Sequence, residues 1–240
     1  MALRQAQLGD FAAAGATIDA GAPYLTRLRK SEAKDGLPVA AVDALGKLSV
    51  ALVAFERDDF STARHILMGV ENDLDKIKPA GGAEVAQKSL VLWQVADFAG
   101  RAAYESRDYG AAEQAAVRAQ AARRVLGTEA VFDRRDLGGL ATWRAMAQAR
   151  QGKYAEATKL IVPVVKYDRE LAARNHGDQW VSIELASALY VQALTDKSRS
   201  AELLREAAAL IDGAVPAVRN LHDVRRWRER IAAEQPATHH

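Results

Sequence analysis

The chain has 240 residues, 49% of them hydrophobic, and its 33 Lys and Arg nearly balance its 31 Asp and Glu, for a net charge of +2. This balance argues against generic nucleic-acid binding, which needs a surplus of cations to replace the counterions of phosphate. The absence of cysteine excludes disulfides, thiolate nucleophiles and cysteine-based zinc sites.

No apolar run approaches the ~18 residues of a membrane span, so no membrane partner is expected. No basic-then-apolar signal peptide opens the chain, which favours a cytoplasmic location. The apolar pattern from Leu3 to Leu8 is typical of the end of a helix whose start is missing. We therefore expect Met1 to begin a fragment of a larger protein, and the compartment stays open if the native N-terminus lies upstream.

Periodicity of apolar residues predicts an all-α chain, because alanine is abundant and alternating strand patterns are nearly absent. Pro38 suits a first helical turn, whereas Pro23 and Pro163 fall inside helices and should kink them. Breaks are predicted at Asp35-Gly36, at 78–82 and at Gly127. The predicted helices cover 2–8, 10–30, 38–57, 59–77, 83–106, 109–126, 135–151, 153–174, 178–195, 199–212 and 220–234.

A short phrase recurs between these helices: an aromatic residue followed three positions later by alanine. The four aromatics lie 49, 49 and 45 residues apart, and a degraded fifth copy carries Ser198 in the aromatic's place. Each copy is predicted to be a turn between antiparallel helices, where the aromatic fills the gap and the alanine permits close approach. Chance recurrence in an alanine-rich chain is the alternative. The four copies are Gly9-Asp10-Phe11-Ala12-Ala13-Ala14, Asp58-Asp59-Phe60-Ser61-Thr62-Ala63, Arg107-Asp108-Tyr109-Gly110-Ala111-Ala112 and Gly152-Lys153-Tyr154-Ala155-Glu156-Ala157.

The phrase resembles the turn of tetratricopeptide repeats, which carry Gly-x-Tyr-x-x-Ala between two helices. The copy at 152–157 matches in full, and the family's small mid-helix residue falls on Ala51, Gly100 and Ala145. The repeats here are longer than the ~34 residues of the standard repeat. The resemblance implies a single domain over 1–234, a right-handed superhelix of about five hairpins plus a C-terminal capping helix. Residues 235–240 are expected to form a disordered tail, with His239-His240 consistent with vector-derived sequence.

In that family the first helix of each hairpin lines the inner surface, where a protein or peptide partner binds. We align the family's inward-facing positions with this chain on the small mid-helix residues. The resemblance then assigns the inner surface to one set of residues. The set comprises Leu45, Leu48, Leu52, Phe55, Glu56, Gln94, Asp97, Arg101, Tyr104, Glu105, Thr142, Met146 and Arg150. The alternative for Asp97 and Arg101 is a mutual ion pair on a wet surface that recognises nothing.

The stretch from Leu185 to Arg228 is similar to the end of tetratricopeptide arrays in some bacterial signalling proteins. The resemblance implies a non-enzymatic protein- or peptide-binding scaffold, the interaction or sensory region of such a protein. The alternative is a regulator that senses a small molecule or peptide inside the superhelix. A pocket of several hundred Å3 closed by Trp and Tyr would favour that alternative.

The sequence predicts no catalytic residue, metal site or cofactor. It has no phosphate-binding loop, no Gly-x-Ser-x-Gly elbow and no His-Glu-x-x-His. His65, His176 and His222 lie in different hairpins, and Asn175-His176-Gly177-Asp178 reads as a helix boundary rather than a site. The acidic groups alternate with basic residues, as on a solvated face. These groups are Glu71, Asp73 and Asp75, and Asp133 and Asp136.

An apolar stripe on the last predicted helix indicates that Trp227 seals the array, with arginines on the wet side. The alternative is a nucleic-acid surface in which Trp227 stacks on bases. Trp93, Trp143 and Trp180 are expected in the core, with partner binding as the alternative. The stripe is Leu221, Val224, Trp227 and Ile231, and the arginines are Arg219, Arg225, Arg226, Arg228 and Arg230.

Overall fold

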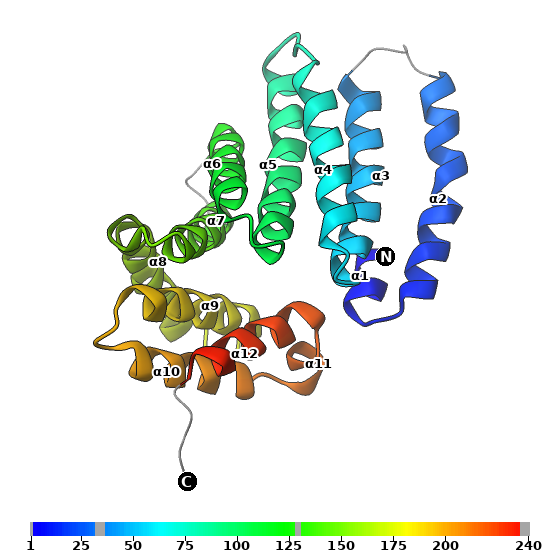
Figure 1. Cartoon of the computed structure of the whole chain (residues 1–240). Helices are drawn as coiled ribbons and strands as arrows, with labels where there is room; N and C mark the ends of the chain where they lie inside the picture. The colour runs from blue at the N-terminus through cyan, green and yellow to red at the C-terminus, as the bar shows by residue number, and fades with distance from the viewer. Residues whose placement is uncertain (1, 32–36, 128–130, 236–240) are drawn as a thin grey trace. The chain divides into compact units, whose positions relative to one another are not determined.

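The protein is described by a computed structural model over residues 2–31, 37–127 and 131–235 (Figure 1). This part of the chain forms twelve helices and no strand, which confirms the all-α prediction. The helices are α1 Ala2–Gln7, α2 Phe11–Ser31, α3 Leu37–Glu56, α4 Phe60–Asp75, α5 Gly82–Glu105, α6 Tyr109–Val125, α7 Val131–Arg150, α8 Tyr154–Arg174, α9 Gln179–Thr195, α10 Ser200–Asp212, α11 Pro216–Arg219 and α12 His222–Glu234.

The helix boundaries follow the periodicity closely, with two exceptions. α7 begins at Val131 rather than at 135, and the short α11 was not predicted. Pro23 and Pro163 lie inside α2 and α8 as expected, and α4 and α5 are separated at 76–81. The predicted break at Asp35-Gly36 and the tail from 236 onward lie outside the described residues.

The chain divides into two compact units, residues 1–140 and 141–240, and the division falls within α7. The prediction of one repeat domain over residues 1–234 stays a prediction.

In the first unit the helices pack as sequence neighbours: α1 with α2, α3 with α4, and α5 with α6 (Figure 1). α5 also contacts α3 and α4. Its main core joins α3, α4 and α5 through small and branched side chains, which exclude water along the whole length of the hairpin. The buried members of this core are Ala41, Ala44, Leu48, Ala51, Leu52, Leu67, Val70, Leu74, Val91, Val95 and Ala99.

The four copies of the recurring phrase share one turn geometry. The residue two positions before each aromatic has a positive φ, and the aromatic itself begins the second helix. The amide of the intervening residue donates to a carbonyl five residues earlier, as in a Schellman motif. The positive-φ residues are Gly9 (82°), Asp58 (61°), Arg107 (62°) and Gly152 (77°). These backbone hydrogen bonds run from the amide of Asp10 to Gln5 O (2.9 Å), from that of Asp59 to Ala54 O (3.0 Å), from that of Asp108 to Ala103 O (2.9 Å) and from that of Lys153 to Gln148 O (2.9 Å).

In three of these turns the same residue that closes the first helix also caps the second. The carboxylates of Asp10, Asp59 and Asp108 accept hydrogen bonds from the amides of Ala13, Thr62 and Ala111 at 3.0 to 3.1 Å. Lys153 has no such side-chain cap. The degraded fifth copy differs, because α10 begins at Ser200, two residues after Ser198.

The alanine of the phrase is buried in each of the four full copies, as close approach of the two helices requires, whereas Ala201 of the degraded fifth copy is exposed. Ala14, Ala63 and Ala157 are fully buried, and Ala112 is 4% exposed. The aromatics begin equivalent helices but do not lie at one depth. Phe11, Phe60 and Tyr109 are partly buried, whereas Tyr154 is 48% exposed, so it does not fill the gap between helices.

The small mid-helix residues lie where two helices meet. Ala51 and Ala145 are fully buried. A Cβ atom added to Gly100 would lie 3.3 Å from the backbone oxygen of Ala112 and 3.3 Å from the Cβ of Ala115. Glycine at this position therefore lets α5 and α6 pack backbone to backbone.

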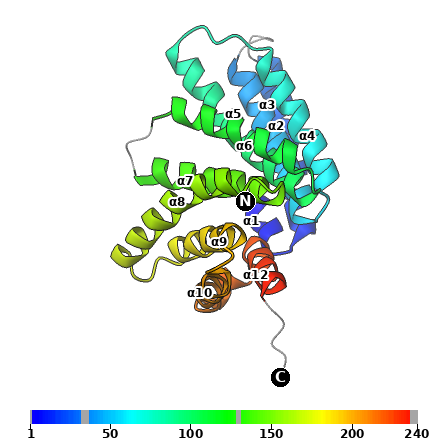
Figure 2. The same cartoon turned by 60° about the vertical axis from the view of Figure 1, so that its left-hand side comes forward.

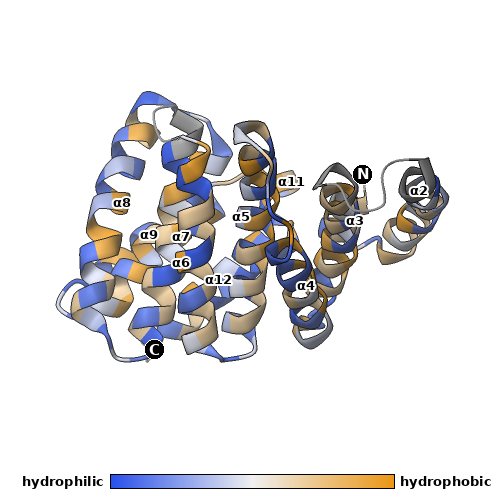
Figure 3. Ribbon diagram, turned by 90° about the horizontal axis from the view of Figure 1, so that it is seen from above, coloured by the Kyte–Doolittle hydropathy of each residue, from blue (hydrophilic) through white to orange (hydrophobic). Residues whose placement is uncertain are grey.

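The second unit stacks α8, α9 and α10, with α12 against α10 and α9 (Figure 2). Hydrophobic and hydrophilic residues alternate along α8, as expected for a helix with one buried face (Figure 3). An aromatic cluster joins the end of α7 to α9 and α12. The ring centroid of Trp227 lies 5.4 Å from that of Trp143 and 5.8 Å from that of Tyr190.

The apolar stripe of α12 is buried, as the capping interpretation predicts. Leu221, Val224, Trp227 and Ile231 are between 1% and 7% exposed. Arg226 corrects the prediction that the arginines stay wet, because it is only 8% exposed. Arg230 lies over the ring of Trp227, with its guanidinium carbon 4.7 Å from the centroid, so a cation already covers one face of this ring.

Candidate functional site

The inward positions carried over from the tetratricopeptide resemblance lie on α3, α5 and α7, and most are buried. Leu45 and Arg150 are exposed, and Gln94, Arg101 and Glu105 are partly exposed. The other eight are at most 7% exposed and offer little surface to a partner. They are Leu48, Leu52, Phe55, Glu56, Asp97, Tyr104, Thr142 and Met146.

Aromatic neighbours account for part of this burial. Phe55 packs edge-to-face against Phe60, at 5.3 Å between ring centroids, and against Phe98, at 6.2 Å. Tyr104 lies 5.2 Å from Tyr109. The partner-binding role of the predicted set stays a prediction, and its accessible members are few.

Asp97 and Arg101 form the ion pair that the sequence suggested as an alternative to partner binding. Arg101 Nη2 lies 2.7 Å from Asp97 Oδ2. The pair is not on a wet surface, because the side chains are only 6% and 21% exposed. The Arg101 guanidinium also lies over the ring of Phe98, with its carbon 4.8 Å from the centroid. These groups stabilise each other within the first unit.

In the second unit Arg150 is held by Tyr190 of α9 and Glu234 of α12. Its Nη2 donates to the hydroxyl of Tyr190 at 2.8 Å and to Glu234 Oε1 at 2.7 Å. Of the tryptophans expected in the core, Trp143 is buried and Trp93 partly so, but Trp180 is 47% exposed.

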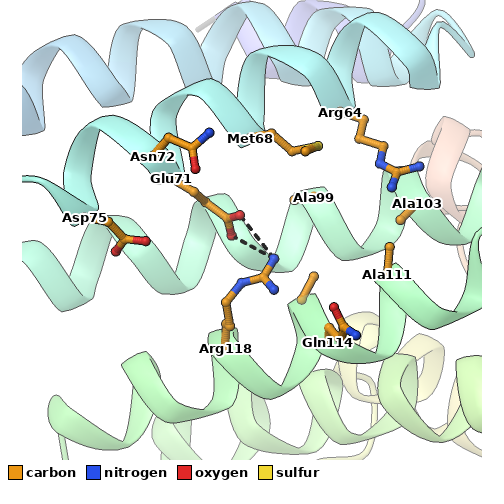
Figure 4. A pocket seen from close by; sticks show the side chains of 11 residues that line it. Arg64, Met68, Glu71, Asn72, Asp75, Ala99, Ala103, Ala111, Gln114 and Arg118 are labelled. Carbon is orange, nitrogen blue, oxygen red and sulfur yellow. Dashed lines mark hydrogen bonds and ion pairs between the residues drawn. The ribbon is translucent and has the colours of Figure 1, made fainter.

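An open groove lies in the first unit between α4 and α6, with α5 as its floor (Figure 4). Its volume is about 400 Å3. The floor is built from alanines of α5 and α6, and the walls carry polar and charged side chains, together with the 47% exposed Met68. The lining residues are Arg64, Met68, Glu71, Asn72 and Asp75 from α4, Ala99 and Ala103 from α5, and Ala111, Gln114, Ala115 and Arg118 from α6.

The local sequence explains why the floor is shallow and smooth. Ala99 and Ala103 lie near Gly100 on α5, where α6 approaches so closely that even a Cβ atom at Gly100 would make tight contacts of 3.3 Å. α4 and α6 are both second helices of their hairpins, and non-equivalent faces of the two helices form the two walls. Small residues on the floor and long residues in the walls produce an elongated groove that can accept an extended segment.

One ion pair spans the groove. Arg118 Nη2 of α6 lies 3.1 Å from Glu71 Oε2 of α4, and Figure 4 shows the two side chains extending toward each other. Glu71 is only 13% exposed, whereas Arg118 is 52% exposed. Burial raises the pKa of the Glu71 carboxyl, as does the nearby charge of Asp75, while Arg118 opposes the rise. The sequence interpretation of Glu71 as part of a solvated face is therefore wrong.

A second ion pair closes one end. Arg64 Nη2 lies 2.7 Å from Asp108 Oδ2, at the N-cap of α6. The hydrogen bond from the Ala111 amide lowers the pKa of the Asp108 carboxyl, and that from Arg64 adds to the effect. Asp73, by contrast, is on the solvated face as predicted, between Lys47 at 3.3 Å and Lys76 at 3.1 Å.

The groove combines small apolar side chains with charged and polar ones. Among the residues that the structure describes, no group of three or more His, Asp or Glu side chains could hold a metal ion. In the same residues no helix is both long and apolar enough to span a membrane. What the groove supplies is an apolar floor for contact area and polar walls that fix orientation, the usual composition of a recognition surface.

One sequence signal points to this site. Glu71 and Asp75 lie four residues apart on a helix, and Met68 lies one turn before them on the same side. An exposed methionine beside two carboxylates indicates an uncovered face. Comparison with protein-family models and with curated proteins found no match to the chain.

Proposed function

We propose that the chain is a non-enzymatic, tetratricopeptide-like helical repeat module, and that its α4–α6 groove binds a segment of a partner protein or a peptide. The observation that carries the proposal is the groove itself. The groove has a volume of about 400 Å3, a floor of alanines and four charged side chains in its walls. A backbone segment can lie on such a floor while side chains reach the walls.

The superhelical arrangement is part of this proposal. Its support is the turn geometry that recurs at Gly9, Asp58, Arg107 and Gly152, together with the packing of successive helices. Placement within a larger bacterial signalling protein rests on the resemblance of the closing stretch alone.

The groove is preferred over the inner surface because its walls carry exposed side chains, although most of its floor alanines are buried. The exposed wall residues are Met68, Asn72, Asp75, Gln114 and Arg118. Binding of a small molecule receives less support, because no Trp or Tyr in the described part of the chain lines this groove or the cavity adjoining it. Shallow open troughs also bury too little of a small ligand.

The proposal is tested by selection from a random peptide library displayed on phage, with the purified chain as bait. Enriched peptides are synthesised, and their affinities for three proteins are measured by calorimetry. Gln114→Trp fills the groove from an exposed position, and Val117→Trp places the same ring on α6 outside the lining.

Peptides that bind the native chain and Val117→Trp, but not Gln114→Trp, are the expected result. If no peptide is enriched, or if every enriched peptide binds Gln114→Trp equally well, the groove is not the binding site.

A further inference from the structure

The groove continues past the Glu71–Arg118 ion pair into a second cavity of about 350 Å3. Glu71, Asp75 and Arg118 line both cavities, so they lie at the junction. Beyond them the lining is mainly apolar, with Leu92 and Ala96 of α5 and Ala122 and the 55% exposed Val125 of α6. In the described residues the second cavity is thus a mainly apolar recess that includes Ser89 and has its charged side chains at the mouth.

The charges at this mouth do not balance. Of the described residues that line it, Arg118 is the single cation, and it is bound to Glu71. Asp75 lies one helical turn from Glu71 and adds a second negative charge, whose repulsion helps to raise the pKa of Glu71. Among the described residues Asp75 has no ion pair or hydrogen bond. The neighbouring Lys76 is bound to Asp73 instead, at 3.1 Å.

The other end of the groove cannot supply the missing cation. Arg64 is held by Asp108 at 2.7 Å, and it lies three helical turns from Asp75 along α4. One end of the site is therefore neutral, whereas the end beside the apolar recess carries an excess of negative charge.

A side chain with an apolar stem and a cationic tip matches this combination. Lysine and arginine bury their methylene groups against apolar surface while the charged group stays at the edge. Of the two, arginine can bridge a pair of carboxylates with its planar fork of donors. An acidic segment would instead meet Glu71 and Asp75 unfavourably.

We infer, on the basis of the proposed function, that the α4–α6 groove selects a partner segment carrying a basic residue, whose stem enters the recess lined by Leu92, Ala96 and Val125 and whose cation binds Asp75 and Glu71. Arg118 then shares Glu71 with the incoming cation. Small or apolar residues next to the basic one lie on the alanine floor.

The test compares peptide selections on three proteins. They are the native chain, the double variant Glu71→Gln, Asp75→Asn, and the control Asp73→Asn, which removes an acidic group from the solvated side of the same helix. Peptides from the native selection are then titrated against all three proteins at two salt concentrations. Circular dichroism verifies that each variant is folded.

The expected result is one strongly enriched Arg or Lys position in the native and Asp73→Asn selections, and its loss in the double variant while apolar positions persist. The affinity of a native-selected peptide should fall about tenfold or more in the double variant, the loss of a hydrogen-bonded charge pair. That difference should shrink as salt is raised.

The outcomes separate the two proposals. Groove-dependent peptides without a basic position, with an acidic one, or with a basic position that survives the double variant overturn the inference and leave peptide binding intact. If no groove-dependent peptide is selected, the proposed function fails and the inference fails with it.

Discussion

Gly100 of α5 lies so close to Ala115 of α6 that a Cβ atom at Gly100 would be 3.3 Å from the Cβ of Ala115. We expect Gly100→Ala to leave the free energy of unfolding within about 1 kcal/mol of the native value, because better helix propensity offsets the tight contact. Gly100→Leu has no such compensation and should lower it by about 3 kcal/mol. Urea denaturation measures both. Gly69→Leu is the control, since nothing lies within 4 Å of Gly69; equal effects at the two positions would contradict the close approach.

Arg107 occupies the left-handed turn position that glycine occupies in two other copies of the phrase. Its φ is 62°, a conformation that costs a residue with a side chain roughly 1 kcal/mol. Arg107→Gly should therefore stabilise the chain by about 0.5 to 1 kcal/mol, and Gly152→Ala should destabilise it by a similar amount. Thermal unfolding of the two variants measures whether stability rises in Arg107→Gly and falls in Gly152→Ala. A loss of stability in Arg107→Gly would show that its side chain contributes more than its backbone costs.

Asp108 both caps α6 and binds Arg64. Asp108→Ala should cost about 1 kcal/mol, the usual value of an N-cap. Asp108→Asn keeps a cap acceptor but removes the charge, and it should cost less. Because hydrogen bonds lower the pKa of Asp108 in the folded chain, its contribution is complete above the ordinary value of 3.8 and is lost as the pH falls through the lower folded value. The difference between native chain and Asp108→Ala should therefore shrink only in strong acid; shrinkage near neutral pH would argue against this cause.

Trp227 is 7% exposed and contacts two other aromatic rings. Trp227→Ala should lower the free energy of unfolding of the second unit by about 3 to 5 kcal/mol. Trp180→Ala, which truncates a 47% exposed ring on α9, should cost less than about 1 kcal/mol. Denaturation monitored by far-ultraviolet circular dichroism measures the loss of stability in each variant. Comparable losses would mean that the exposed ring also packs.

Glu71 should respond to pH in the opposite direction to Asp108. Since burial raises its pKa, the folded chain binds this proton more tightly than the unfolded chain does. Its contribution to stability therefore rises as the pH falls through the raised folded-state value, and it levels off below the ordinary value of 4.5. Subtracting the stability of Glu71→Gln from that of the native chain isolates this group. A difference that stays constant from neutral pH down to 4.5 would contradict the burial of the carboxylate.

The helices and turns could be predicted from the sequence because their causes are local. The aspartates and glycines before each aromatic satisfy helix ends within a few residues, and Ala63 or Ala157 follows at fixed spacing. Even here the aromatics were only partly predicted. Tyr154 begins its helix like Tyr109 but is exposed, because depth depends on what the rest of the chain places beside the ring.

The groove could not be predicted in the same way. It exists because one face of α4 and one face of α6 stay uncovered, which depends on the path of the whole unit. Conversely, Phe55 and Tyr104 were expected to face a partner, but Phe60, Phe98 and Tyr109 pack against them. A position transferred from a resemblance is assigned to the correct helix, but the residues that pack against it can differ from those in the family.

The shared aspartate of the hairpin turns limits how the chain can change its length. The amide of Asp59 donates to Ala54 O at the end of α3, and its carboxylate accepts from the Thr62 amide at the start of α4. A single residue therefore caps both helices. Inserting one residue there would rotate the second helix by about 100° and carry Ala63 away from the hairpin interface. Length differences between hairpins are therefore tolerated elsewhere, as in the link at 76–81 between α4 and α5. Insertions and deletions over evolutionary time should accumulate in such links and spare the turns.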